Sequence, residues 1–198
     1  MRQNRKPFRN GDVVDGIDWS RWTVILCKPD CVQRGLVDQV LDRIAASGVT
    51  VSARLELTVQ AWQAHVHYWD MLVDADWYDR DIPACLDALY AGKAVTVALG
   101  YGEEGIQRRV RRLLGDFDPT QATPGSIRGD LGDDSLDAAI AGKRLVDNVV
   151  HTSDDEAAAR RDFGIWFGAN RRALLSAQSA RARAYPPRTD RSSIWRLP

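Results

Sequence analysis

Three side chains in the sequence are of types that can carry chemistry, and each stands in a loop beside a predicted element. Lys28 follows a short apolar segment, and Arg128 lies in a glycine-flanked run where it could clamp a ligand. His151 precedes an acidic helix start, where it could be catalytic. Each residue also has a structural interpretation: a solvated lysine, an arginine paired with a carboxylate such as Asp130, and a helix-terminus histidine. Considered one at a time, the residues leave both interpretations open.

Strands that alternate with helices must position these loops. The apolar run at 22–27 predicts a buried strand, and the alternation of apolar and polar residues at 51–59 predicts a strand with one buried face. Two further strand-like segments lie at 94–99 and 148–150. Apolar residues at helical spacing predict helices over 36–45, 62–72, 83–90, 106–114 and 153–167. This order predicts an α/β sandwich of the ferredoxin-like kind, with a sheet that helices cover on one face.

The composition is that of one globular domain with short extensions. The chain has 198 residues, of which 44% are apolar and 27% charged, and this excludes collagenous, disordered and disulfide-stapled classes. Its 27 basic and 27 acidic residues give no net charge, which excludes a globally basic nucleic-acid binder. We expect an N-terminal extension at 1–21, a main domain at 22–167 and an arginine-rich C-terminal extension at 168–198.

The C-terminal extension has a charge balance of its own. It contains seven arginines and a single acidic residue, Asp190. Such a segment could bind nucleic acid, or it could lie over the acidic body of its own or a neighbouring subunit. Tyr185 and Trp195 have the character of anchors. We therefore favour the second interpretation and expect no nucleic acid as a partner.

Cysteine content and hydropathy indicate a soluble protein of the cytoplasm. Cys27, Cys31 and Cys85 lack the paired spacing of a zinc or redox site, so we expect reduced thiols and no metal site. No stretch approaches the roughly 18 consecutive apolar residues of a membrane span, so we expect no membrane contact. His65 and His67 are two positions apart on a predicted helix and point in different directions, which places them at its surface and edge rather than on one metal.

Four separated motifs, taken together and in this order, resemble the nucleoside diphosphate kinase family. They are KPDCVQRGLV at 28–37, His67-Tyr68, PGSIRGD at 124–130 and NVVHTSD at 148–154. The resemblance covers Trp22 to Phe167. It implies an α/β (α+β) fold, a ferredoxin-like sandwich with a four-stranded antiparallel sheet covered by helices. It also implies an enzyme, a phosphotransferase that moves the γ-phosphate of ATP or another nucleoside triphosphate to a nucleoside diphosphate through a phosphohistidine.

The resemblance implies a role for each matching residue. His151 matches the nucleophile, and a neutral imidazole can attack phosphorus without a base that removes a proton. The family's substrate-binding positions match Lys28, Tyr68, Arg111, Arg128 and Asn148. The three cations among them would neutralise phosphate oxygens, the tyrosine would lie near the histidine and the phosphates, and the asparagine would contact the ribose. Mg²⁺ would arrive with the nucleotide, without a dedicated protein site.

Several residues depart from the pattern of the family. Cys31 replaces a glycine, and Thr152 replaces a glycine next to the nucleophile, where it could alter the approach to the histidine. Phe117 stands where a threonine helps to bind phosphate, and a phenyl ring cannot donate that hydrogen bond. Asp162 occupies the place of the glutamate that, together with Ser153, orients the histidine. Because its side chain is one methylene shorter, it could reach the histidine only through water or a backbone shift.

Two loops also differ in length from the family. Gly132–Gly142 is an acidic, alanine-rich insertion before the histidine motif, in a region that the family places beside the active site and at subunit contacts. The loop at 73–82 lacks the phenylalanine on which the family stacks the nucleobase. Trp77 or Tyr78 could supply an equivalent aromatic face, with Leu86 near the base, or the aromatic pair could simply pack under the enlarged loop.

Two further functions remain open beside nucleoside diphosphate kinase. The altered base and sugar regions would suit a kinase for a specialised modified nucleotide. The departures at Phe117, Thr152 and Asp162 would suit a nucleotide-binding regulatory or scaffolding protein with reduced or lost catalysis. Because the family forms homo-oligomers, we also expect a homo-oligomer.

Overall fold

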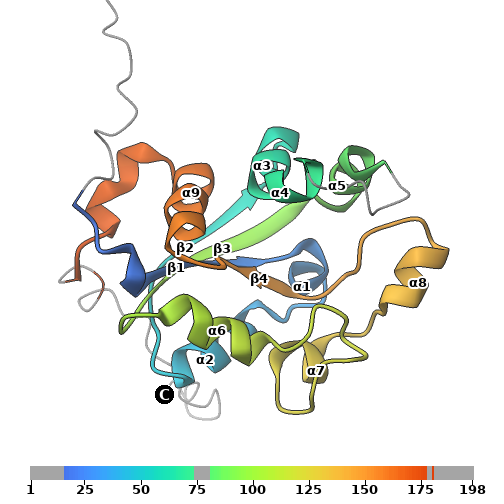
Figure 1. Cartoon of the computed structure of the whole chain (residues 1–198), viewed down its shortest axis with the longest axis horizontal. Helices are drawn as coiled ribbons and strands as arrows, with labels where there is room; N and C mark the ends of the chain where they lie inside the picture. The colour runs from blue at the N-terminus through green and yellow to red at the C-terminus, as the bar shows by residue number, and fades with distance from the viewer. Residues whose placement is uncertain (1–15, 74–80, 178–179, 181–198) are drawn as a thin grey trace, which may run out of the picture.

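The computed structural model describes residues 16–73, 81–177 and 180, and Figure 1 shows their arrangement. Within them, a four-stranded antiparallel sheet lies between two sets of helices. The strands are β1 (Trp22–Cys27), β2 (Thr50–Thr58), β3 (Ala94–Tyr101) and β4 (Val150–Thr152), in the order β2-β3-β1-β4. The sheet confirms the predicted fold class.

The helices follow the predicted order, with short helices added in the loops. The α-helices are α1 (Pro29–Gln33), α2 (Val37–Ala46), α3 (Ala61–His67), α4 (Trp69–Val73), α5 (Ile82–Tyr90), α6 (Ile106–Leu114), α7 (Ile127–Leu131), α8 (Leu136–Ala141) and α9 (Glu156–Trp166). Two 3₁₀ turns, η1 (Trp19–Arg21) and η3 (Ala169–Leu174), flank them. The single helix predicted over 62–72 is broken at Tyr68, which leaves the helical conformation. None of the helices in the described part of the chain could span a membrane.

Helices cover both faces of the sheet, so the expectation of one covered face is wrong. Val24 and Leu26 of β1 belong to the core under α3, α5 and α9, whereas Ile25 and Cys27 belong to the core under α2 and α6. All six residues of β1 are buried. A strand covered on both faces needs an uninterrupted apolar run, which is what the sequence has at 22–27.

The strand that carries His151 begins two residues later than predicted. Val149 has a φ of 68°, and the backbone N–H of Val150 donates to the carbonyl oxygen of Asn148 over 2.7 Å. This tight turn precedes β4, so 148–150 is not a strand and the predicted bounds are wrong. His151 is the middle residue of β4, opposite Leu26 of the central strand β1. The histidine therefore lies on an edge strand that is paired with the inner strand β1.

Candidate active site

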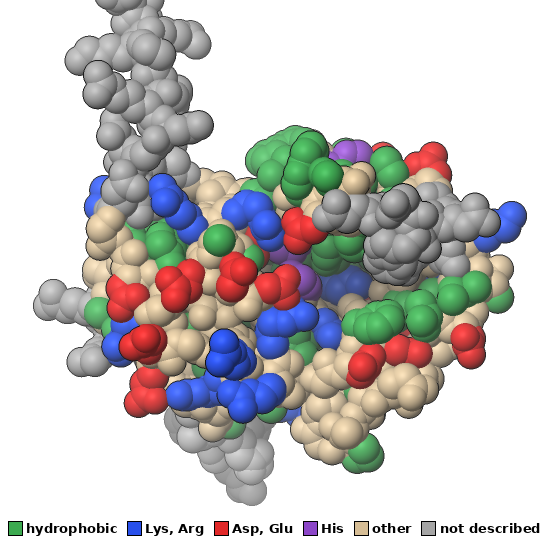
Figure 2. Space-filling view, in the orientation of Figure 1, with side chains coloured by type: hydrophobic (Ala, Val, Ile, Leu, Met, Phe, Trp, Pro, Cys, Tyr) green, Lys and Arg blue, Asp and Glu red, His purple; other side chains and the backbone are tan. Residues whose placement is uncertain are grey.

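A cleft of about 270 Å³ lies over β4 and brings together the residues that the motifs singled out. Its lining includes Lys28, His67, Tyr68, Asp70, Met71, Leu89, Tyr90, Arg111, Phe117, Arg128, Leu145, Val146, Asn148, His151, Asp154 and Arg161. Figure 2 shows histidine in a hollow of this face of the molecule, next to Lys and Arg side chains. The predicted nucleophile and all five predicted substrate-binding residues thus line one cleft.

The imidazole of His151 is enclosed by two other rings. Its ring centroid lies 4.8 Å from that of His67 and 5.5 Å from that of Tyr68, and both contacts are edge to face. Burial lowers the pKa of His151 well below its usual range, and the neighbouring His67, Arg111 and Arg128 lower it further. The ring is therefore neutral at pH 7, the form in which a ring nitrogen can act as a nucleophile.

Lys28 lies where β1 gives way to α1, and its side chain is 4% exposed. Its Nζ donates to the carbonyl oxygen of Val146 and to Oδ1 of Asn148, each over 2.9 Å. Burial lowers the pKa of Lys28 to about 8. The ammonium form is still the major one at pH 7, and its hydrogen bonds fix the cation at the floor of the cleft.

Two arginines approach the cleft from the other side of β4. Arg128 is 4% exposed and donates to the carbonyl oxygens of Gly115 and Val150, over 3.2 and 2.8 Å. Its Nε is buried and has no partner among the described residues. Burial, with a contribution from Arg111, lowers the pKa of Arg128 to about 10. Arg111 is more exposed and forms an ion pair with Asp154, so an anion in the cleft would find one fixed and one movable guanidinium.

Tyr68 and Asn148 are both held by hydrogen bonds to neighbouring residues. The hydroxyl groups of Tyr68 and Tyr90 lie 2.6 Å apart, and burial raises the pKa of both tyrosines above the usual range. Nδ2 of Asn148 donates to the carbonyl oxygen of Phe117 over 2.8 Å. Tyr90 could not be predicted as a site residue, because a tyrosine at the end of a helix gives no local sign of such a contact.

Asp162 is bound to His67, Ser153 and its neighbour Arg161, and no described hydrogen bond joins it to His151. Its Oδ1 lies 3.0 Å from Nδ1 of His67, and its Oδ2 accepts a hydrogen bond of 2.9 Å from the hydroxyl of Ser153. The hydroxyl of Ser153 in turn accepts from the backbone N–H of Val24. The expectation that His67 lies at a helix surface or edge is wrong, because its side chain is 1% exposed. His65, in contrast, is partly exposed and pairs with Asp87.

Two of the departures from the family pattern are accommodated by the backbone. Cys31 lies inside α1, is fully buried and has no positive φ, so its β-carbon causes no backbone strain. Thr152 follows His151 in a strand, where successive side chains point to opposite faces. The side chain of Thr152 is fully buried on the face away from the His151 side chain. It therefore does not stand in the approach to His151.

The part of the cleft that could receive a nucleobase differs from the prediction. Leu86 is fully buried in the core, so its predicted place near the base is wrong. Leu89, one helical turn further along α5, lines the cleft instead, together with Met71 and Leu145. Trp77 and Tyr78 lie outside the described residues. Phe117 is 53% exposed at the cleft and gives this end of it an aromatic surface.

His67, His151 and Asp162 present donor atoms within 4.8 Å of one another, which raises the question of a metal ion. Both carboxylate oxygens of Asp162 and Nδ1 of His67 already take part in hydrogen bonds. The positive charges of Lys28, Arg111 and Arg128 also disfavour a cation nearby. We therefore interpret the cluster as a hydrogen-bonded group rather than a metal site.

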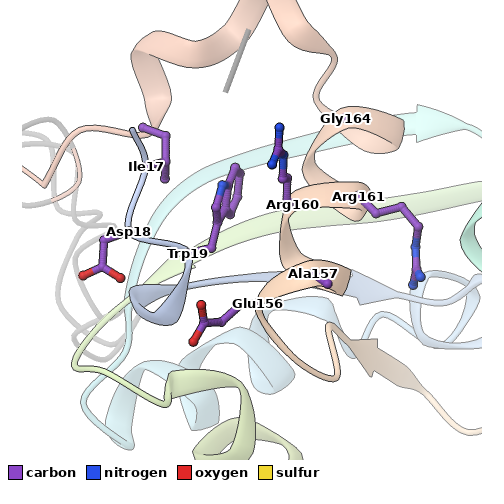
Figure 3. Close-up of a pocket in the computed structure, with 8 residues that line it drawn as sticks. All are labelled: Ile17, Asp18, Trp19, Glu156, Ala157, Arg160, Arg161 and Gly164. Carbon is purple, nitrogen blue, oxygen red and sulfur yellow. The ribbon is translucent and has the colours of Figure 1, made fainter. Parts of the chain in front are cut away.

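A larger hollow of about 670 Å³ lies at the start of α9, beside η1. Figure 3 shows Trp19 and Arg160 side by side in this hollow, while Arg161 points away from Trp19. The described residues of its lining carry charges of both signs, among them Asp18 and Glu156, and include no histidine or cysteine. The cleft at His151 combines a neutral imidazole with three cations, so we expect the chemistry in that cleft.

Comparisons with known proteins identify the family. A family profile described as nucleoside diphosphate kinase matches residues 21–171. The chain belongs to the nucleoside diphosphate kinase family. It is 36% identical, over 145 residues, to a nucleoside diphosphate kinase of a Nocardioides species, an alignment that covers 73% of this chain and 95% of that protein.

Solved structures of nucleoside diphosphate kinases share the fold. A transition-state mimic of the enzyme from Borrelia burgdorferi, with bound vanadate and ADP, has a TM-score of 0.69 and 31% identity, and the match covers 76% of this chain and 88% of that one. The enzyme from Halobacterium salinarum in complex with CDP has a TM-score of 0.59 and 29% identity, with coverages of 74% and 86%. These similarities support a nucleoside diphosphate kinase, a phosphotransferase, and do not favour a regulatory or scaffolding protein.

Proposed function

We propose that His151 of this nucleoside diphosphate kinase carries the phosphoryl group between two nucleotides. In the first step a ring nitrogen of His151 attacks the γ-phosphorus of a nucleoside triphosphate, a P–N bond forms, and the nucleoside diphosphate leaves as the P–O bond breaks. In the second step the terminal oxygen of an acceptor diphosphate attacks the same phosphorus, and the P–N bond breaks. The neutral imidazole in a cleft lined by cations is the observation that carries this proposal.

The cations of the cleft would supply most of the catalysis. Phosphoryl transfer needs in-line positioning and neutralisation of charge on the equatorial oxygens rather than covalent help. Lys28 and Arg128 are buried and fixed by hydrogen bonds, so they are organised before the nucleotide binds. Arg111 would exchange its ion pair with Asp154 for a phosphate oxygen. Tyr68 would lie against the phosphates and Asn148 against the ribose.

We propose that Mg²⁺ enters with the nucleotide phosphates. The described carboxylates that line the cleft, Asp70 and Asp154, are each paired with an arginine, Asp154 with Arg111 and Asp70 with Arg161. They therefore do not form a ready set of oxygen ligands. The ion would reduce the negative charge of the phosphate groups, while Lys28, Arg111 and Arg128 would orient them.

A transfer assay tests the proposal. The protein with ATP, Mg²⁺ and a panel of nucleoside diphosphates should form the corresponding triphosphates, and His151→Gln should abolish the transfer. His65→Gln is the matched control, because His65 lies on the surface of α3 and contacts Asp87. Transfer to common diphosphates supports a general enzyme, and transfer restricted to a modified nucleotide supports a specialised one. Absence of transfer with any acceptor would refute the proposal.

We also propose that the chain forms a homo-oligomer in the cytoplasm. Trp62, Trp69 and Val73 are more than half exposed on the neighbouring helices α3 and α4, and a subunit contact would cover them. The three cysteines are unpaired, as is common in a reducing compartment. Sedimentation velocity on the full chain tests the assembly, and a monomer at micromolar concentration would contradict it.

A further inference from the structure

The buried carboxylate of Asp162 contacts the neighbour of the nucleophile. Oδ1 of Asp162 lies 3.0 Å from Nδ1 of His67, and the two side chains are 0% and 1% exposed. Oδ2 is occupied by the hydroxyl of Ser153. Among the described residues, no hydrogen bond reaches either ring nitrogen of His151. The short acidic side chain therefore acts on His67, and its effect on the nucleophile has to pass through that ring.

The chemistry of its neighbours determines which nitrogen of His67 carries the proton. Nδ1 lies near the carboxylate of Asp162, which when ionised can only accept, and 3.2 Å from Nε1 of Trp166, which can only donate. One ring nitrogen cannot serve both partners, and the charge-assisted bond to the carboxylate is the stronger. Nδ1–H therefore donates to Asp162. Nε2 of His67 is buried and has no partner among the described atoms.

The ring of His67 meets the ring of His151 nearly at a right angle. Their centroids are 4.8 Å apart with an interplanar angle of 84°, and Tyr68 contacts the same imidazole at 5.5 Å and 63°. Rotation about the terminal side-chain torsion of a histidine has a broad energy profile, so packing must fix it where hydrogen bonds do not. The two edge-to-face contacts are therefore the described contacts that set the orientation of His151.

We propose that His67 is a positioning residue: Asp162 fixes the ring of His67, and this ring holds the imidazole of His151 in the orientation for attack. The proposal rests on the proposed function, because it names the residue that positions the nucleophile of that reaction. Asp162 would thus orient the imidazole of His151 indirectly, through the ring of His67. A longer acidic side chain could orient that imidazole by direct contact.

A double-mutant cycle with steady-state kinetics tests the proposal. His67→Asn keeps an amide donor near the position of Nδ1 but removes the ring, and Asp162→Asn removes the charge that fixes it. Each should lower kcat by about 10- to 100-fold, the cost of a misplaced reacting group, with KM almost unchanged because the phosphate-binding cations are intact. The kcat of the double variant should be no lower than that of the less active single variant, because the two residues act as one unit. His65→Asn, on the same helix, should behave as wild type.

Three outcomes separate the possibilities. A folded His67→Asn variant with the kcat of wild type would overturn the proposal, and so would a double variant whose loss is the product of the two single losses. Both results leave the proposed function intact, since the wild-type protein still transfers phosphate. A wild-type protein without transfer would instead refute the proposed function, and this inference would fall with it.

The tautomer of His67 in the wild-type protein provides a test that needs no substitution at His67 or Asp162. The chain contains three histidines, so their imidazole signals in a two-bond proton–nitrogen NMR spectrum can be assigned by single substitutions at His65 and His151. The proposal expects the Nδ1–H tautomer for His67. A spectrum in which His67 is protonated on Nε2 alone would overturn it, because Asp162 would then not fix the ring.

Discussion

Lys28 donates from Nζ to Oδ1 of Asn148 over 2.9 Å, although the two residues are 120 positions apart in the sequence. A second contact joins the same segments, because the backbone N–H of Lys28 donates to the carbonyl oxygen of Val149 over 2.9 Å. The turn before β4 and the loop after β1 therefore form one unit. A change in the charge of Lys28 should affect both the phosphate site and the asparagine that we place near the ribose.

The lowered pKa of Lys28 predicts a loss of activity at alkaline pH. Because this pKa is about 8, Lys28 is cationic below pH 8 and loses its charge as the pH rises further. The value of kcat/KM, which reports the free enzyme, should therefore fall as the pH passes through about 8. Lys28→Arg should be less active overall but should lack this fall, since arginine stays charged. An identical alkaline fall in Lys28→Arg would show that another group is responsible.

Substitution of Phe117 by threonine should raise the affinity for nucleotide. The phenyl ring is half exposed at the cleft and cannot donate to a phosphate oxygen, whereas threonine can. Phe117→Thr should lower KM about three- to tenfold, as expected for one added hydrogen bond of about 1 kcal/mol. Phe117→Ala separates this effect from the loss of the ring. Equal KM values for the threonine and alanine variants would contradict the expected hydrogen bond.

Substitution of Thr152 should change the stability of the protein without changing its activity. Its hydroxyl is buried and has no partner among the described residues, on the face of β4 away from His151. Thr152→Val removes the unpaired hydroxyl and should raise the free energy of unfolding by about 1 kcal/mol, with kcat unchanged. Thr152→Ser keeps the hydroxyl and should be destabilising. Urea denaturation measures both, and a valine variant less stable than wild type would refute the assignment.

The insertion Gly132–Gly142 is tied to the cleft through Asp134. This carboxylate accepts from both terminal nitrogens of Arg144 and from the backbone N–H of Asp147, and the hydrogen bonds from Arg144 lower its pKa to about 2. Asp134→Asn should loosen the segment that carries Asn148. An ion pair with one partly exposed partner contributes about 1 kcal/mol, so KM should rise about two- to fivefold.

A neighbouring substitution provides the control for Asp134. Asp133 lies in the same insertion but is exposed and pairs with Arg34. Asp133→Asn should leave KM unchanged at the pH of the assay. If Asp133→Asn and Asp134→Asn raise KM equally, the effect comes from the charge of the insertion rather than from the contact with Arg144.

Local patterns in the sequence predicted the inner strand β1 better than the segment that carries His151. The apolar run at 22–27 matches β1 residue for residue, because a strand buried on both faces requires such a run. The segment at 148–150 has the same apolar character, but the positive φ of Val149 breaks it, and a β-branched residue gives no local sign of that conformation.

Some contacts around His151 could be predicted from the sequence and others could not. The motifs and their order predicted that Lys28, Arg128 and His151 lie in one cleft. The burial of His67 could not be read from the spacing in its own helix, because it depends on Asp162 and Trp166 of α9. A contact of this kind between distant helices becomes visible only in the folded chain.

Mapping of the labelled residue decides whether His151 carries the phosphoryl group. The wild-type chain is incubated with a γ-labelled triphosphate and Mg²⁺ in the absence of an acceptor, and the labelled protein is digested and mapped. We predict acid-labile, base-stable label on the peptide that contains His151, its complete release on addition of a nucleoside diphosphate, and no label on His151→Ala. Label on another residue, or a wild-type protein that takes up none from any common triphosphate, would contradict the phosphohistidine.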